Sequence, residues 1–297
     1  MNEYRRVRAV PKLPRREREG HKGSYGHVLV VGGSPGMIGA PALAANACLR
    51  AGAGLVTVAV PEGIQQAVAV LCPCATSVRL ACDGKGQPHN SAVRQLLEQL
   101  AGCDVLAMGP GFGLTPGYVQ LVRAALEQEK PAVLDASGLH DLCAIGDWPS
   151  RRHCPLVLTP HPGEFGRLAG VSPKDVQKDR LNLAVTCARR WAGHGSRQLP
   201  LILVLKGAGT IVTDGRRVYV NGTGNPGMAT GGAGDVLTGV IAALIGQGLA
   251  PFEAAVLGVN VHGRAGDLAA RDLGEVSMIA SDLLDYLPRA MKATMRA

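Results

Sequence analysis

The sequence predicts an α/β fold with a mainly parallel central sheet, flanked by helices, and a helical C-terminal third. Short, almost unbroken apolar runs rich in β-branched residues alternate with longer Ala- and Leu-rich stretches, and no strand candidate follows residue 220. Unbroken apolar runs are typical of strands covered on both faces. Strand–helix alternation indicates parallel strands joined by right-handed crossovers.

The predicted elements follow this alternation in order. The strands are expected at residues 27–31, 55–60, 104–108, 132–135, 156–159 and 201–206. The helices between them are expected at residues 40–50, 91–100, 116–127 and 173–191. Residues 210–213 and 217–220 flank Asp214-Gly215, a turn signal that predicts a hairpin. Helices are then expected at about 233–247, 252–270 and 278–290, with no linker, so residues 22–297 are predicted to form a single domain.

The net charge of +8 lies at the two ends of the chain. Residues 1–22 hold eight basic and three acidic residues, residues 289–297 hold three basic residues, and the remainder is balanced. We therefore interpret residues 1–21 as a solvated basic tail. Aromatic residues make up 3% of the chain, which leaves little for base stacking, so no nucleic-acid partner is expected.

The chain is predicted to be cytoplasmic. Gly, Pro and charged residues interrupt the apolar stretches, so no membrane span is expected, and no secretory signal is recognised. The eight cysteines are scattered through apolar segments, which is typical of buried free thiols in a reducing compartment.

Glycine or polar clusters follow four of the predicted strands. Ligands of open α/β sheets bind at the carboxyl ends of strands, so these clusters predict one large site. The clusters lie at residues 32–34, 109–113, 159–164 and 206–210.

Gly222, Gly224 and Gly227 have the spacing of a dinucleotide-binding fingerprint. That fingerprint opens a helix directly and lies inside a strand–helix–strand unit. Here Asn225-Pro226 interrupts it, and no strand follows the next helix. The fingerprint interpretation is therefore not favoured.

Residues 230–235 (TGGAGD) lead into an apolar stretch that predicts a buried helix. The N-terminus of such a helix presents free N–H groups and partial positive charge, which suits a phosphate group. Asp235 has an alternative as a cap or first-turn acid. Beside glycines and an anion site, however, it suits phosphoryl transfer to a hydroxyl, in which the carboxylate accepts the proton.

Residues 225–239 (NPGMATGGAGDVLTG) resemble the signature of the ADP/ATP-dependent NAD(P)H-hydrate dehydratases, members of the ribokinase-like superfamily. Four other segments resemble the same family in the same order, and the resemblance spans about residues 22–288. They are residues 22–59, 109–113, 158–164 (LTPHPGE) and 205–210 (LKGAGT). The resemblance implies a ribokinase-like fold and a hydro-lyase that repairs hydrated NADH or NADPH at the expense of ADP or ATP.

The resemblance also implies roles for individual residues. Asp235 would accept the proton of the hydrate hydroxyl as that hydroxyl attacks the terminal phosphate. Gly234 would supply an anion-hole amide, and Glu164 would help to hold Mg²⁺ through water, with the metal mostly on the phosphates. The substrate-contact positions are Ala40, Gly111, His161 and Asp235. The adenine-nucleotide loop is Lys206, Gly207, Ala208, Gly209 and Thr210.

Each of three side chains has a purely structural alternative. Lys206 is also an ordinary strand-end lysine, His161 a loop histidine between two prolines, and Glu164 a first-turn helix acid. Two segments depart from the family. Ala233 stands where Thr or Ser is usual, and residues 135–140 read DASGLH in place of Asp-Ala-Asp-Ala-Leu-Asn.

Three other functions stay open at this point. A ribokinase-like kinase of a small alcohol, such as a hydroxymethylpyrimidine, would use the same aspartate and nucleotide. A hydride-transferring oxidoreductase would use Gly222–Gly227, and a nucleotide sensor would not need Asp235 for turnover. From the family we also expect a homotetramer. The 21 residues before the first motif leave no room for a fused epimerase, so a functional link to a separate one is expected.

Overall fold

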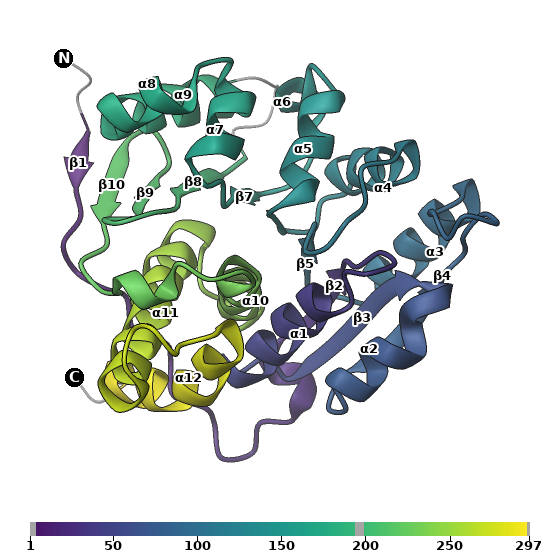
Figure 1. The fold of residues 1–297 in the computed structure, drawn as a ribbon, viewed down its shortest axis with the longest axis horizontal. Coiled ribbons are helices and arrows are strands. Elements are labelled where there is room, and N and C mark those ends of the chain that lie inside the picture. The colour runs from purple at the N-terminus through teal and green to yellow at the C-terminus, as the bar shows by residue number, and fades with distance from the viewer. Residues whose placement is uncertain (1–3, 194–198, 296–297) are drawn as a thin grey trace.

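The computed structural model describes residues 4–193 and 199–295. Within these ranges the chain forms one ten-stranded sheet with the order β1-β10-β9-β8-β7-β6-β5-β2-β3-β4 (Figure 1). Its pairs are parallel except where β9 meets β8 and β10. The strands are β1 (Arg5–Arg6), β2 (His27–Val31), β3 (Leu55–Pro61), β4 (Thr76–Leu80), β5 (Val105–Met108), β6 (Ala132–Leu134), β7 (Leu156–Leu158), β8 (Leu201–Leu205), β9 (Ile211–Thr213) and β10 (Arg217–Val220).

Helices cover both faces of the sheet, which confirms the predicted mainly parallel, doubly covered α/β fold. Successive strand residues enter different cores: Val28 and Val30 join one buried cluster, and Leu29 and Val31 join the other. The first cluster lies under α1 (Gly39–Arg50), α2 (Gln65–Leu71), α10 (Ala233–Gly246), α11 (Pro251–Leu273) and α12 (Ala280–Met295). The second lies under α3 (Asn90–Ala101), α4 (Pro116–Leu126), α5 (Ser137–Ala144), α6 (Trp148–Arg151), α7 (Pro162–Ala169), α8 (Pro173–Lys178) and α9 (Arg180–Ala192).

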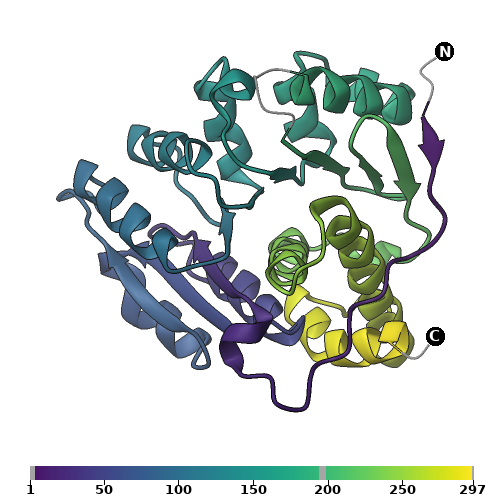
Figure 2. The same cartoon turned by 180° about the vertical axis from the view of Figure 1, so that it is seen from behind.

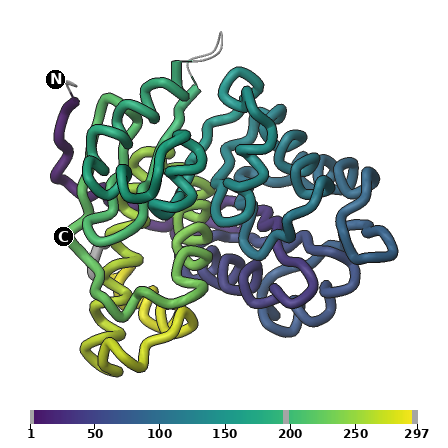
Figure 3. The backbone as a smooth tube through the Cα atoms, turned by 45° about the horizontal axis from the view of Figure 1, so that its top comes forward, coloured from purple at the N-terminus to yellow at the C-terminus, as the bar shows by residue number. Residues whose placement is uncertain are grey.

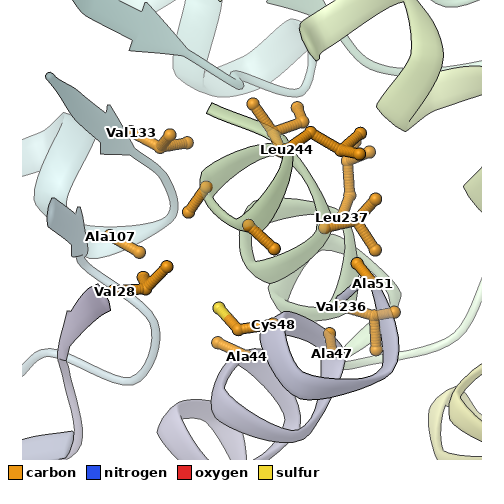
Figure 4. Close-up of a cluster of buried hydrophobic side chains, with 14 of the residues drawn as sticks. Val28, Ala44, Ala47, Cys48, Ala51, Ala107, Val133, Val236, Leu237 and Leu244 are labelled. Atoms are coloured by element: carbon orange, nitrogen blue, oxygen red, sulfur yellow. The ribbon is translucent and has the colours of Figure 1, made fainter. Parts of the chain in front are cut away.

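Helix α10 packs against the sheet beside α1, and both helices contact the strands directly. Its buried residues face small side chains of α1 and strand residues such as Val28 and Val133 (Figure 4). The two helices approach closely, because Gly239 lacks a side chain and the Cys48 thiol donates to its carbonyl oxygen at 3.2 Å. The buried helix predicted from the apolar sequence is therefore present.

We expect Gly239→Ala to destabilise the protein by about 1–3 kcal/mol, as overpacked cores do. A Cβ at this position would lie 2.1 Å from the carbonyl oxygen of Ala44, so α1 must move. The gain of about 1 kcal/mol from replacing a helical glycine does not offset this. Urea unfolding of Gly239→Ala and of Gly222→Ala tests the point, since nothing lies within 4 Å of a Cβ at Gly222. Equal stability of the two variants would contradict the close approach.

The structure corrects one predicted helix. Residues 173–191 form two helices, α8 and α9, because Asp179 leaves the helical conformation (φ −146°, ψ 57°). Its carboxylate accepts the backbone N–H of Asn182 and so caps α9. Several short elements were not predicted: β1, β4, α2, α5, α6 and α7.

Residues 4–21 also differ from a free solvated tail. Strand β1 pairs in parallel with β10, and Val7, Val10 and Leu13 pack against the helical core. The segment runs along the C-terminal helices before it reaches β2 (Figure 2). The basic side chains are exposed as expected, whereas the apolar residues at every third position, which attach the segment, were not recognised as an attachment in the sequence.

None of the helices in the described ranges is long and apolar enough to cross a membrane.

Candidate active site

The N-terminus of α10 meets the carboxyl ends of β6 and β8 in the middle of the molecule, where Figure 3 shows the green helix. Asp135 directly follows β6 and Lys206 directly follows β8. Both side chains lie against Gly234 in the first turn of α10. Three segments that are distant in sequence thus converge at the edge where the sequence placed a site.

Lys206 and Asp135 form a buried ion pair. The Lys206 Nζ donates to Asp135 Oδ1 at 2.6 Å, and Asp135 is 1% exposed. The Thr238 hydroxyl lies 2.8 Å from Asp135 Oδ2. Burial alone would raise the pKa of the Asp135 carboxyl, but the Lys206 ammonium and these hydrogen bonds hold that pKa below its usual value. The carboxylate and the ammonium are therefore both charged near neutral pH.

Gly234 allows this pair to reach the helix terminus. A Cβ there would lie 3.1 Å from Lys206 Nζ and 3.3 Å from Asp135 Oδ2. The preceding Gly232 has φ of 94°, a left-handed conformation that favours glycine. The glycines of the TGGAGD segment thus form the turn into α10 and keep its first N–H groups accessible.

Asp235 lies in the first turn of α10, beside the same charges. Burial raises the pKa of its carboxyl to about 7, and the negative charges of Asp135 and Glu164 add to this, while Lys206 opposes it. A carboxylate whose pKa lies near the working pH is suited to accept a proton.

His161 and Glu164 lie at the N-terminus of α7, and both side chains have the structural role that the sequence offered as an alternative. The His161 Nδ1 accepts the backbone N–H groups of Gly163 and Glu164, and Glu164 Oε2 accepts the N–H of His161, which completes a capping box. Yet Glu164 Oε2 also lies 3.8 Å from Lys206 Nζ, and burial raises the pKa of Glu164 to about 7. The cap thus places both side chains at the edge of the site.

The segment after β8 is an exposed, glycine-rich loop. Gly207 and Gly209 adopt φ of 128° and 62°, and Gly207, Ala208 and Gly209 are exposed, with Thr210 beside them. The Arg180 guanidinium donates to the carbonyl oxygens of Leu205, Lys206 and Ala208, which fixes the loop.

Ala40, in the first turn of α1, lies against Gly111. A Cβ at Gly111 would lie 3.1 Å from the Ala40 Cβ, and one at Gly232 would lie 2.7 Å from Leu43 of α1. Helix α1 thus connects the two places, since it carries Ala40 next to Gly111 and Leu43 next to the turn into α10.

Sequence reasoning missed Asp135, Thr238 and Arg180. Asp135 had a signal, since it is an acid at the carboxyl end of a buried strand, but its partner lies two strands away. The next residue, Ala136, has φ of 50°, a conformation that costs an alanine about 1–3 kcal/mol and that no sequence pattern announces. Gly222–Gly227 does not form a phosphate turn, because the loop packs against α11.

A family model described as NAD(P)H-hydrate dehydratase matches residues 28–289. The chain belongs to this family. It is 50% identical over 284 residues to the bifunctional NAD(P)H-hydrate repair enzyme of Moorella thermoacetica, covering 95% of this chain and 52% of that protein. The chain thus spans about half the length of the curated relatives it matches.

Solved structures agree with this family assignment. The ADP/ATP-dependent NAD(P)H-hydrate dehydratase from Bacillus subtilis, co-crystallized with ATP/Mg²⁺, is 31% identical, with 95% of each chain covered and a TM-score of 0.77. A ribokinase-like superfamily protein from Enterococcus faecalis is 25% identical, with 96% of this chain and 93% of that one covered and a TM-score of 0.81. These relatives confirm the ribokinase-like fold and the dehydratase family, and favour the hydro-lyase over a kinase of a small alcohol.

Proposed function

We propose that this dehydratase-family chain restores NADH or NADPH from the (S)-hydrate at the expense of ADP or ATP. The convergence of Asp235, Lys206 and the glycine-rich start of α10 on one sheet edge carries the proposal. Such a site offers an anion hole beside a proton acceptor, as phosphoryl transfer to a hydroxyl requires.

The residues divide the proposed reaction between them. The loop at Lys206, Gly207, Ala208, Gly209 and Thr210 binds the nucleotide, and the Gly234 N–H faces the transferred phosphoryl group. Asp235 accepts the proton as the hydrate hydroxyl attacks the terminal phosphorus and AMP or ADP leaves. The ring nitrogen then expels phosphate to give an iminium ion, and loss of a proton from the ring carbon next to the one that carried the phosphate regenerates the dihydronicotinamide. Phosphate, with a second pKa of about 6, leaves far more readily than hydroxide. Ala40, Gly111 and His161 would contact the substrate.

Mg²⁺ fits the charge of this site. Three carboxylates, Asp135, Glu164 and Asp235, lie around one lysine, so the cluster carries excess negative charge when all are ionised. Both Asp135 oxygens already have partners, and Asp235 is assigned the proton-accepting role, so Glu164 is the side chain that would hold the ion through water. Bound there, Mg²⁺ would neutralise phosphate charge during transfer.

We expect kcat/KM to rise with pH and to level off above about pH 7, because Asp235 accepts a proton only when ionised. Glu164→Gln should move the rising part of the pH profile of kcat/KM to lower pH, since the Glu164 charge raises the pKa of Asp235. Glutamine retains the capping box, so α7 stays in place. Initial rates from pH 5.5 to 9 for both proteins test this. If the pH profile of the variant rises over the same pH range as that of wild type, Asp235 is not the base whose titration is observed.

A recovery assay tests the function itself. Purified protein is incubated with NADH hydrate or NADPH hydrate, Mg²⁺ and either ADP or ATP, while the dihydronicotinamide absorbance is followed. Nucleotide-dependent recovery is expected, and it would also establish which donor and which hydrate are preferred. No recovery with any combination would favour the kinase alternative, which releases a stable phosphorylated alcohol.

The proposal also covers the location, the oligomeric state and the partners of the enzyme. We propose a cytoplasmic homotetramer that takes its substrate from an NAD(P)H-hydrate epimerase, with small molecules rather than nucleic acid or membrane as partners. The bifunctional repair relatives support the epimerase link. Light scattering would test the tetramer.

A further inference from the structure

His262 of α11 lies beneath the N-terminus of α10 and has no part in the reaction described so far. Its Nε2 lies 2.8 Å from the carbonyl oxygen of Ala233, the first residue of α10. A carbonyl oxygen only accepts hydrogen bonds, so Nε2 carries the hydrogen and donates it. Burial lowers the pKa of His262 to about 4, so the imidazole is neutral at pH 7 and Nδ1 is unprotonated.

The Ala233 carbonyl belongs to the same peptide group as the Gly234 N–H. That group is planar and trans, so its C=O and N–H point in opposite directions and rotate together. A hydrogen bond that fixes the carbonyl therefore fixes the direction of the N–H. It also polarises the amide, which strengthens the N–H as a donor.

The neighbouring part of α11 is held firmly against the loop that leads to α10. The Asp267 carboxylate accepts the Gly224 N–H at 3.1 and 3.0 Å. A Cβ at Gly263 would lie 2.3 Å from the Thr223 hydroxyl, and one at Gly266 would lie 2.3 Å from the Met228 sulfur. These contacts leave α11 little room to shift, so His262 keeps its place relative to Ala233.

We infer that His262 is a positioning residue that aims and polarises the Gly234 N–H toward the transferred phosphoryl group. The inference rests on the anion-hole role proposed for Gly234. Loss of one oxyanion donor costs about 10²–10³ in kcat, and a misdirected donor costs less. An effect of about 10-fold on kcat is therefore expected when the His262 hydrogen bond is removed.

Three variants test the inference. His262→Phe keeps the ring but removes the donor, His262→Gln restores an N–H donor, and Val256→Ala creates a buried vacancy in α11 away from the site. We expect the Phe variant to lose about 10-fold in kcat with little change in ATP affinity by calorimetry, and the Gln variant to recover most of it. The ¹⁵N shift of the Gly234 amide should move in the Phe variant and return in the Gln variant.

Two results would overturn the role of His262. One is wild-type kcat and an unmoved Gly234 signal in His262→Phe. The other is an equal loss of kcat in Val256→Ala at the same loss of Tm, which would show general destabilisation of α11. Failure of the proposed function is distinguishable, because wild-type protein would then show no hydrate turnover while the Gly234 signal still reports on His262.

Discussion

Asp235→Asn should lower turnover of the hydrate by about 10²–10⁴-fold, the usual contribution of a positioned general base. The amide has nearly the shape of the carboxylate but does not accept the hydroxyl proton at neutral pH. Nucleotide affinity should change little, because the nucleotide loop and the Gly234 N–H are untouched. Single-turnover kinetics and calorimetry with ATP separate the two effects.

The pH dependence of the stability of Asp235→Asn provides a second test. The folded-state pKa of Asp235 is raised to about 7 from 3.8, so its ionisation costs stability in full above about pH 7 and not below about pH 4. Asp235→Asn should therefore be more stable than wild type at pH 8, and the difference should shrink as the pH falls toward 4. Near wild-type turnover in Asp235→Asn would show that Asp235 is not the proton acceptor. A variant less stable at pH 8 would contradict the raised pKa.

The sequence was most informative where one local pattern decides the structure. Unbroken apolar runs located the core strands β2, β3, β5, β6, β7 and β8 to within a residue at each end. The TGGAGD segment before an apolar stretch likewise located the start of α10. In both cases burial on all sides leaves a signature within a few residues.

The missed features depend on partners that are distant in sequence. Strand β4 is partly exposed and lacks an apolar run, and β1 exists because it pairs with β10. Asp135 and Lys206 lie 71 residues apart, and the pairing of β6, β7 and β8 brings them together. His262 looks like any histidine in a helix until its bond to Ala233 is known. The sequence thus located the edge of the site, whereas the hydrogen-bonding network behind it required the tertiary structure.

The Lys206–Asp135 pair gives the largest expected effect on stability. Removing one partner of a buried pair leaves an uncompensated charge and costs about 3–5 kcal/mol. We expect this loss in Lys206→Met, since Asp135 is 1% exposed, and a smaller loss in Asp135→Asn, because Glu164 and Asp235 still face the Lys206 ammonium. The double variant should recover much of the stability lost in Lys206→Met, because Asp135 no longer carries a charge without a partner. Urea unfolding of the cycle measures these terms.

In the double variant, ATP affinity and folding stability should respond differently. The double variant lacks the ammonium beside the α10 N-terminus, so it should bind ATP weakly although it is stably folded. Arg94→Ala provides the control, because the Arg94–Glu98 pair on α3 is exposed and such pairs contribute about 0–1 kcal/mol. Full stability of Lys206→Met would show that Asp135 is not held as a charge. Wild-type ATP affinity in the stable double variant would exclude Lys206 from the nucleotide site, since the ammonium would then be needed only to neutralise Asp135.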